Sequence, residues 1–437
     1  MDYRNGENDI MDNFEMNINI SPTDKNYNYY QSFAKQVSDW YSDGKVSELA
    51  SQDTRFMLEL QKEKLKSLGL ELEMKTEEPE VDTERVSSLS YGDNVFVNSI
   101  IGGNKHITIS VHKSQNEIFR YTGEGTLSII MQNPKEGNLP SPKTPVCCPH
   151  CGAPSTLGKL EDGCEFCDSK FLMDELYPKV MHFFIKEDNE NYFEENQIKK
   201  YILGGFIFFS VLSIGGMIID LLTEGTRINI VFEVVSRLAG SLFAGAIFGG
   251  LAWFIAGSVG TVKLMRKSAR GATKTMNSLS FCHKMRLIDP TFSTEYFRDK
   301  SMSLLKLMIY SKNPQELTIC KCDKPIPEKF REIVDMTYFN SGVDKYSFKD
   351  GICNVSLTFY IDSLHYHNGE ILRKSDKIRM SLRKVINKPT NLGFSAMAVS
   401  CPSCGASFDA EKLKNCPFCD SVYPLEENEW VVTDISI

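Results

Sequence analysis

The stretch YILGGFIFFSVLSIGGMII, residues 201–219, runs for 19 residues without a charge and follows Lys199-Lys200 directly. A second uncharged stretch of 25 residues runs from Leu238 to Val262. Either is long enough to cross a hydrocarbon core of about 30 Å at about 1.5 Å per residue. Two core helices in a soluble protein are the alternative, but apolar runs of about 18 or more residues are typical of membrane spans. The sequence predicts a transmembrane hairpin over residues 197–263, with spans at about 201–222 and 238–262.

Positive charge lies mainly at the two outer ends of this hairpin. Lys199 and Lys200 precede the first span, whereas the connector of about 17 residues holds only Arg227 and Arg237. Excess lysine and arginine mark the cytoplasmic side of a membrane. We therefore expect a multi-pass protein of the cell inner (plasma) membrane with both termini cytoplasmic. The basic run after the second span either binds anionic lipid or is an ordinary cytoplasmic flank; it contains Lys263, Arg266, Lys267, Arg270 and Lys274.

Small residues recur at four-residue spacing within the spans. Such rows let helix backbones approach closely in lipid, so they predict packing within the hairpin or a homodimer through the small-residue faces. The pairs are Gly240/Ala244, Gly245/Gly249, Ala246/Gly250 and Ala252/Ala256.

Length and charge narrow the class of protein further. A chain of 437 residues holds two or three domains. A net charge of −8 and a pI of about 5.6 argue against nucleic acid as a partner, which usually requires a basic face. Residues 1–28 are acidic and rich in asparagine, without an apolar core, and are predicted to be a disordered tail.

The segments before and after the hairpin repeat the same features in the same order. Each begins with a helical stretch, Tyr29–Leu70 or Thr291–Met336, and WYSDGKVSEL (40–49) in the first resembles IYSKNPQEL (309–317) in the second. The sequence therefore predicts an internal duplication. One apolar face is expected on each helix; it comprises Phe33, Val37 and Trp40 in the first half and Phe297, Met302, Leu305 and Met308 in the second.

Runs with period-two alternation follow in both halves and predict antiparallel strands. Gly102-Gly103, Asp350-Gly351 and Asn368-Gly369 are the expected turns, and Met74–Asp82 reads as a solvated acidic connector. The predicted strands cover 94–101, 106–113, 117–124 and 126–132, then 344–349, 353–362, 363–370 and 377–386, with closing strands at 179–185 and 430–437.

Each half also contains a module of four cysteines in two Cys-x-x-Cys pairs. Two such pairs on tight turns place four sulfurs around a tetrahedral metal ion. The glycine after the second cysteine permits a positive φ, and the aspartate at the matching place of the second pair tolerates it. The predicted metal ligands are Cys148, Cys151, Cys164 and Cys167 in residues 147–170, and Cys401, Cys404, Cys416 and Cys419 in residues 400–421.

Structural zinc is the favoured occupant of these sites, with two ions per chain. Disulfides are disfavoured in the cytoplasm, and iron in a rubredoxin-like site is the other alternative. Four thiolates leave no open coordination position, so hydrolytic zinc chemistry is not expected. Cys147 lies next to the first ligand and could replace Cys148, but the phrase Cys-Pro-x-Cys-Gly favours Cys148.

The second half resembles a known family. The residues that carry the resemblance are Ile288-Asp289-Pro290-Thr291-Phe292-Ser293, the helical turn before Leu317 and the closing Trp430-Val431-Val432-Thr433-Asp434-Ile435. They are similar to the Tim forty-four-like domain, named after a membrane-associated subunit of the mitochondrial presequence translocase. The resemblance implies a cone-like α+β fold, similar to nuclear transport factor two, that binds protein or lipid near a membrane. It carries no catalytic residues, and the first half, which lacks the Asp-Pro-x-Phe-Ser entry, resembles the cone more loosely.

These observations predict an α+β fold with two cone-like helix-plus-curved-antiparallel-sheet domains, each with an inserted zinc ribbon, separated by the hairpin. The predicted domains are 29–196 and 264–437. The function expected is a non-enzymatic membrane scaffold that binds a protein, peptide or lipid partner.

Two other functions are weaker alternatives. The first is a small-molecule sensor or enzyme that uses the cavity of a cone, with His365 and His367 beside Asp362 as acid–base candidates. The second is nucleic-acid binding through the ribbons, which the acidic residues around the cysteines oppose.

Overall fold

The computed structural model describes residues 14–437 except 80–83, 93–95, 136–139, 188–194, 225–229, 273–274, 290–291, 293, 387–397 and 412. The fold is mixed α+β, as predicted. The chain forms two compact units: the hairpin, Asn189–Thr273, and a second unit that combines the segments before and after it, Met1–Asp188 and Lys274–Ile437.

The hairpin unit consists of two long helices, α6 (Glu195–Glu224) and α7 (Ile230–Ala272). Both contain windows long and apolar enough to cross a membrane, Ile198–Asp220 and Val231–Ala256. Only 6% and 17% of these windows is buried, unlike the core helices of a soluble protein. The connector is shorter than the sequence suggests, because both helices continue beyond the apolar runs.

Glycines allow α6 and α7 to approach closely. A Cβ on Gly245 would lie 2.5 Å from the backbone nitrogen of Phe206, and one on Gly249 would lie 2.5 Å from the carbonyl oxygen of Tyr201. This row of small residues therefore packs within the hairpin. A Cβ on Gly240 or Gly250 would meet nothing within 4 Å among the described residues, so homodimerisation through those faces stays a prediction.

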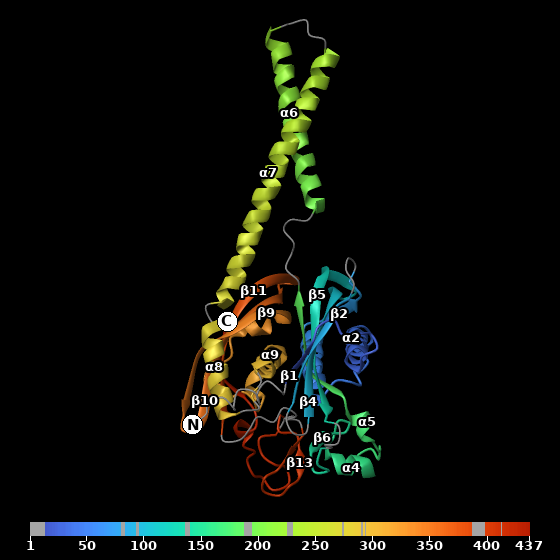
Figure 1. Cartoon of the computed structure of the whole chain (residues 1–437), viewed down its shortest axis with the longest axis vertical. Helices are drawn as coiled ribbons and strands as arrows, with labels where there is room; N and C mark the ends of the chain where they lie inside the picture. The colour runs from blue at the N-terminus through green and yellow to red at the C-terminus, as the bar shows by residue number, and fades with distance from the viewer. Residues whose placement is uncertain are drawn as a thin grey trace, which may run out of the picture. The chain divides into compact units, whose positions relative to one another are not determined.

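The first half of the other unit folds around an antiparallel sheet (Figure 1). Its strands pair in the order β1-β3-β4-β5-β8, and β2 pairs with the second part of the long β4. Residues 70–77 thus form a strand where the sequence suggests a helix end and a connector. The tail prediction also fails at Phe14–Asn17, which pairs with β3; Met1–Asn13 lies outside the described residues. The strands are β1 (Phe14–Asn17), β2 (Leu70–Glu77), β3 (Val86–Gly92), β4 (Phe96–Lys113), β5 (Asn116–Pro134) and β8 (Lys179–Glu187).

Gly102-Gly103 is not a turn, contrary to the sequence prediction. β4 continues through both glycines, and the reason is a close tertiary contact. The hydroxyl of Tyr30 donates to the carbonyl oxygen of Gly103 at 3.0 Å, and a Cβ on Gly103 would lie 2.7 Å from that hydroxyl oxygen. The hairpin turn occurs instead at Ser114-Gln115, where φ is 49° and 69° without a glycine.

The second half contains a four-stranded antiparallel sheet in the order β14-β11-β10-β9. The turns Asp350-Gly351 and Asn368-Gly369 are confirmed, with all four φ angles between 52° and 90°. Two of the predicted strands, 353–362 and 363–370, form one long strand that ends at His367. The strands are β9 (Ile333–Lys349), β10 (Ile352–His367), β11 (Glu370–Val385) and β14 (Val431–Ser436).

Helices pack against both sheets through the predicted apolar faces. Phe33, Val37 and Trp40 on the first helix are buried, as are Phe297, Met302, Leu305 and Met308. The predicted helical stretch 291–336 is an α-helix only over Thr294–Tyr310; two 3-10 turns follow it, and β9 begins at Ile333. The helices are α2 (Lys25–Asp43), α3 (Gln52–Ser67), α8 (Thr275–Ile288) and α9 (Thr294–Tyr310), with short 3-10 turns η1 (Pro314–Glu316), η2 (Glu328–Arg331) and η3 (Leu425–Glu427).

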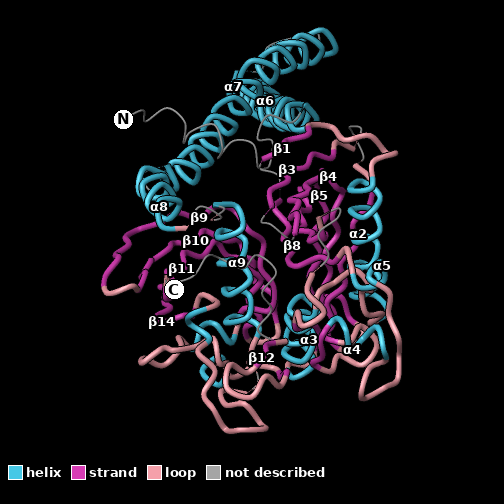
Figure 2. Tube along the Cα trace, turned by 60° about the horizontal axis from the view of Figure 1, so that its bottom comes forward, coloured by secondary structure: helices cyan, strands magenta, loops and turns pink. Residues whose placement is uncertain are grey.

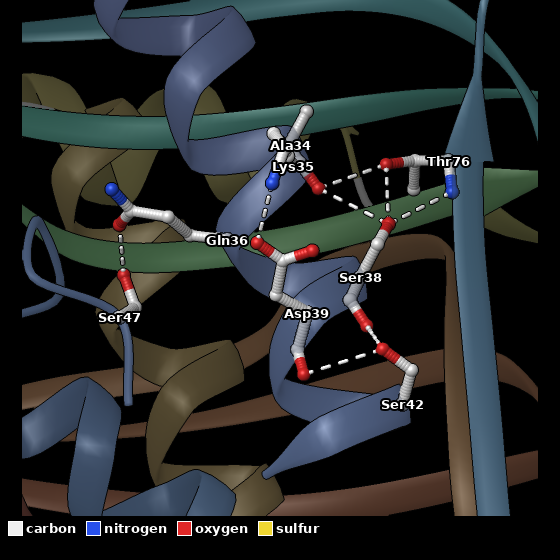
Figure 3. A network of polar contacts seen from close by, with 8 residues as sticks. All are labelled: Ala34, Lys35, Gln36, Ser38, Asp39, Ser42, Ser47 and Thr76. Carbon is white, nitrogen blue, oxygen red and sulfur yellow. Dashed lines mark hydrogen bonds and ion pairs between the residues drawn. The ribbon is translucent and has the colours of Figure 1, made fainter. Parts of the chain in front are cut away.

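Side-chain hydrogen bonds hold the loop after α2 (Figure 3). Gln36 Oε1 accepts from the hydroxyl of Ser47 at 2.6 Å. It also accepts from the backbone N–H of Leu49 at 3.1 Å. Ser38 accepts from the backbone N–H of Thr76 at 3.1 Å and so ties α2 to β2. These bonds position the loop so that Leu49 can pair with β8, the closing strand of the first sheet.

Backbone pairing at that point supports the internal duplication. In the first half, the N–H of Val180 donates to Leu49 at 2.6 Å, and the N–H of Ser51 donates back to Val180 at 2.8 Å. In the second half, the N–H of Val432 donates to the carbonyl oxygen of Ile319 at 2.8 Å, and the N–H of Lys321 donates back to that of Val432 at 2.7 Å. In each half, too, three consecutive antiparallel strands are followed by a ribbon and a strand that pairs with the third.

The two halves pack against each other through α3 and α9, and each of these helices also contacts β8 and β9 (Figure 2). Lys64 on α3 is buried and donates to the carbonyl oxygens of Ile309 and Phe330, both at 2.7 Å. Lys306 on α9 donates to the carbonyl oxygen of Phe183 at 3.0 Å. The halves thus share one core, and the division into two cone domains stays a prediction.

Candidate metal centres

The two cysteine modules fold into small ribbons with the same backbone pattern. In ribbon 1 (residues 145–170) the backbone N–H of Gly152 donates to the carbonyl oxygen of Cys148, and that of Asp168 donates to the carbonyl oxygen of Cys164. Gly405 and Asp420 repeat these bonds in ribbon 2 (residues 399–421) at 2.9 Å each. The strands are β6 (Pro145–Cys147) and β7 (Pro154–Thr156) in ribbon 1, followed by α4 (Leu157–Asp162), and β12 (Val399–Ser400) and β13 (Ser407–Phe408) in ribbon 2.

Left-handed backbone conformations make these knuckles possible. The φ angle is 75° at both glycines, Gly152 and Gly405, and 57° and 58° at Asp168 and Asp420. A left-handed residue turns the chain back so that the two cysteines of a pair point to the same side. This part of the sequence prediction is confirmed.

The eight predicted ligands come together as two groups of four. In each group the four Sγ atoms lie within 4.8 Å of one another. The distances Cys148–Cys167, Cys151–Cys164, Cys401–Cys419 and Cys404–Cys416 are all 3.6 Å between sulfurs. This is far beyond a disulfide bond of about 2.05 Å. It is close to the edge of about 3.8 Å of a tetrahedron with metal–sulfur bonds of about 2.3 Å. Both groups could therefore hold a metal ion, and the first uses Cys148 rather than Cys147.

A serine beside the last cysteine of each ribbon supports the thiolate form, a role that the sequence reasoning missed. Ser169 Oγ lies 3.4 Å from Cys167 Sγ, and Ser421 Oγ lies 3.2 Å from Cys419 Sγ. Hydrogen bonds from these serines, with a further contribution from His150 in ribbon 1, lower the pKa of Cys167 to about 5 and that of Cys419 to about 6. The phrase Cys-Asp-Ser in both modules was the available signal.

The bases of the two ribbons differ. Ribbon 1 packs on a separate small cluster of buried residues that includes Phe96, Leu157, Leu160 and Tyr177. Ribbon 2 belongs to the main core of the unit, which includes its Val399, Phe408 and Ala410. The ribbons also contact each other, β7 against β13 and β6 against β12.

Each ribbon is anchored by polar contacts to a different neighbour. At the start of α3, Gln52 donates to the carbonyl oxygen of Cys148 at 3.4 Å, and Arg55 donates to that of Pro149 at 3.2 Å. The hydroxyl of Thr318 lies 2.5 Å from the carbonyl oxygen of Ala410 and 3.0 Å from that of Glu411. Ribbon 1 is therefore held by α3, and ribbon 2 by the segment after α9.

The acid–base candidates are not arranged as predicted. His365 is only 2% exposed, and its Nε2 lies 2.6 Å from Asp376 Oδ2, not beside Asp362. His367 is exposed and its Nδ1 lies 3.2 Å from Glu332 Oε1. The three candidates His365, His367 and Asp362 therefore do not come together as the sequence predicts.

Comparisons of the chain with protein families, with curated proteins and with solved structures find no match. The resemblance to the Tim forty-four-like domain therefore stays a proposal.

Proposed function

We propose that this chain is a non-enzymatic membrane scaffold whose large unit, held together by two structural zinc ions, binds a protein or peptide partner at the cytoplasmic face. The observation that carries the proposal is the closure of both four-sulfur groups. Four protein thiolates fill a tetrahedral zinc ion, so they leave no position for a substrate or an activated water.

Zinc suits these sites better than the alternative metals. Four thiolates in tetrahedral geometry favour zinc or iron, and zinc undergoes no redox change that would need a partner. Binding supplies roughly 10–16 kcal/mol to the folding of such small modules. The ribbons have few buried residues of their own, so metal binding explains how they stay folded.

The charge around the hairpin supports a cytoplasmic location for the large unit. Arg237, one of two arginines in the expected connector, is paired within the hairpin: it donates to Glu233 at 2.9 Å and to the carbonyl oxygen of Ser213 at 2.8 Å. The other, Arg227, lies outside the described residues. The lysines and arginines at the two outer ends of the hairpin then favour the cytoplasmic side for both chain ends.

Exposed aromatic residues favour partner binding by the ribbons. Phe166 and Phe418 precede the last cysteine of ribbon 1 and ribbon 2, and they are 72% and 71% exposed. Aromatic side chains are enriched where proteins bind one another, whereas a monomer gains nothing from exposing them. Equivalent exposure in both copies points to a shared role.

The test begins with the full chain purified in detergent. Metal analysis should find about two zinc ions per chain; iron would redirect the proposal to electron transfer. Partners captured by wild type should be lost when both Phe166 and Phe418 are changed to Ser. Ile18→Ser, which alters an equally exposed residue away from the ribbons, should leave capture unchanged. Equal capture by all three proteins would contradict the proposal.

A groove of about 600 Å³ supports the second candidate, a small-molecule sensor. It lies beside the end of α2 and the start of β2, and its lining includes Trp40, Tyr41, Lys62 and Leu65. A cavity of this size suits a small ligand. A small molecule retained by the purified protein under non-denaturing mass spectrometry, and lost in Leu65→Trp, would favour this function.

A further inference from the structure

A group of buried charged residues lies where ribbon 2 meets the two halves of the large unit. Lys300 on α9 pairs with Glu429, with 2.6 Å between Nζ and Oε2, and its Nζ lies 3.9 Å from Oδ2 of Asp53 on α3. Glu411 of ribbon 2 lines the same cavity, which has a volume of about 10 Å³. His182 on β8 completes the lining from the first sheet. All five side chains are at least nine-tenths buried.

Negative groups outnumber positive ones at this junction. Three carboxyl groups, those of Asp53, Glu411 and Glu429, face one ammonium group, that of Lys300. The neutral His182 adds no charge, because burial lowers its pKa well below the ordinary value. Lys384 on β11 interacts with Glu429 and Lys300. Asp409 of ribbon 2, which accepts from the backbone N–H of Glu411 at 2.9 Å, adds a further negative charge.

Glu411 has the least support of these carboxyl groups. Its Oε2 is buried and has no hydrogen-bond partner among the described residues. An ionised carboxylate in such a place is costly, whereas a neutral carboxyl group is tolerated. Burial and the neighbouring Asp53 raise the pKa of Glu411 well above 4.5.

We propose that Glu411 is a proton-operated latch: the protonated side chain lets ribbon 2 seat in the junction of the two halves, and loss of the proton releases ribbon 2. Ribbon 1 has no such latch. Counting from the second cysteine, Gly158 stands where ribbon 2 has Glu411.

The direction of the pH effect follows from linkage. A group whose pKa is higher in the folded state stabilises that state fully below its unfolded pKa, and the stabilisation is lost as the pH rises through the folded pKa. Opening of ribbon 2 should therefore become easier by up to about tenfold per pH unit above about pH 4.5, and level off above the folded pKa. Protonation of the zinc ligands would act in the opposite direction, opening both ribbons at low pH.

The experiment measures alkylation of the cysteines by iodoacetamide in the zinc-loaded full chain, between about pH 6 and about pH 9. Mass spectrometry gives the rates for the peptides with Cys416–Cys419 and Cys164–Cys167 from one sample. Their ratio cancels the general increase of thiol reactivity with pH. We expect the ratio of ribbon 2 to ribbon 1 to rise several-fold in wild type and to stay flat in Glu411→Gln, which keeps the shape of the neutral acid.

Two further variants guard the interpretation. Glu161→Gln removes an exposed carboxylate from ribbon 1 and should behave like wild type. Asp53→Asn removes the neighbouring negative charge and should reduce the total rise without abolishing it. A flat ratio in wild type, or a rise that persists in Glu411→Gln, would overturn the proposal. So would a rise that millimolar Mg²⁺ or Ca²⁺ suppresses, because a metal ion would then neutralise the junction in place of the proton.

Discussion

Ribbon 1 and ribbon 2 have the same metal-binding knuckles but pack on different groups of buried residues. Their sulfur–sulfur distances and their left-handed residues match, so the part of each ribbon that could hold metal is alike. Beneath the knuckles, ribbon 1 rests on its own small cluster of apolar residues. Ribbon 2 is continuous with the main core and places Glu411 among buried charges. The two ribbons thus share their local chemistry but differ in the contacts that connect them to the rest of the molecule.

The largest expected difference appears when a metal ligand is removed. Cys164→Ser and Cys416→Ser should each lower the metal content from about two ions to about one. Loss of ribbon 2 should also unfold the main core, because Phe408 and Ala410 are part of it, and structural zinc sites contribute roughly 10–16 kcal/mol. Loss of ribbon 1 should leave the main core folded.

Metal analysis combined with limited proteolysis separates these outcomes. Cys416→Ser should expose cleavage sites in both sheets, whereas Cys164→Ser should expose sites only near residues 140–178. Equal resistance of the two variants to proteolysis would show that the two ribbons contribute equally to the stability of the main core, and would contradict the prediction. Ser403→Ala, which alters an exposed knuckle residue that is not a ligand, is the control.

Substitution of the buried apolar residues next to the cysteine pairs should have an effect of intermediate size on stability, and it tests the same difference between the ribbons. Phe408→Ala should destabilise the large unit by about 3–5 kcal/mol, and Leu160→Ala should cost about 2–5 kcal/mol but only locally. Both side chains are buried. Hydrogen exchange followed by mass spectrometry should show faster exchange in α3 and α9 for Phe408→Ala only. Faster exchange confined to each ribbon in both variants would contradict this difference between the ribbons.

The knuckles could be predicted from the sequence because everything they need is local. A Cys-x-x-Cys pair followed by Gly or Asp specifies its own turn, so the ligands and the positive φ angles follow from residues two to four apart. The hairpin is equally local, since about 20 uncharged residues suffice to indicate a span. The same holds for the turns Asp350-Gly351 and Asn368-Gly369.

The sequence did not predict features that depend on distant residues. The pair Gly102-Gly103 is typical of a turn, but in the structure Gly103 accepts a hydrogen bond from Tyr30, which is 73 residues away. The strand β2 was not predicted, because it forms by pairing with β4, which lies about 30 residues further along the chain. His365 was predicted to lie beside Asp362, but strand pairing brings it next to Asp376 in the interior. The charged junction joins α3, α9 and ribbon 2, and no short pattern announces it.

The smallest expected effect concerns the serines that approach the last cysteine of each ribbon, and here the two ribbons should agree. Ser169→Ala and Ser421→Ala each remove a hydrogen bond to a thiolate, which should weaken metal binding by roughly 10- to 100-fold. The pKa of Cys167 and of Cys419 should rise, because these serines are the largest cause of their lowering. Competition with a chelator, repeated over a range of pH, measures both changes, because metal affinity depends on the pKa of the ligands.

A residual difference between the serine variants has a specific source. His150 Nδ1 lies 3.1 Å from Ser169 Oγ, whereas Ser403 takes the place of His150 in ribbon 2. Ser169→Ala should therefore weaken ribbon 1 slightly more than Ser421→Ala weakens ribbon 2, and His150→Ser should bring the two ribbons to the same affinity. If His150→Ser instead weakened ribbon 1 as much as Ser169→Ala does, the histidine would be the main support of the thiolate, and the knuckles themselves would have diverged.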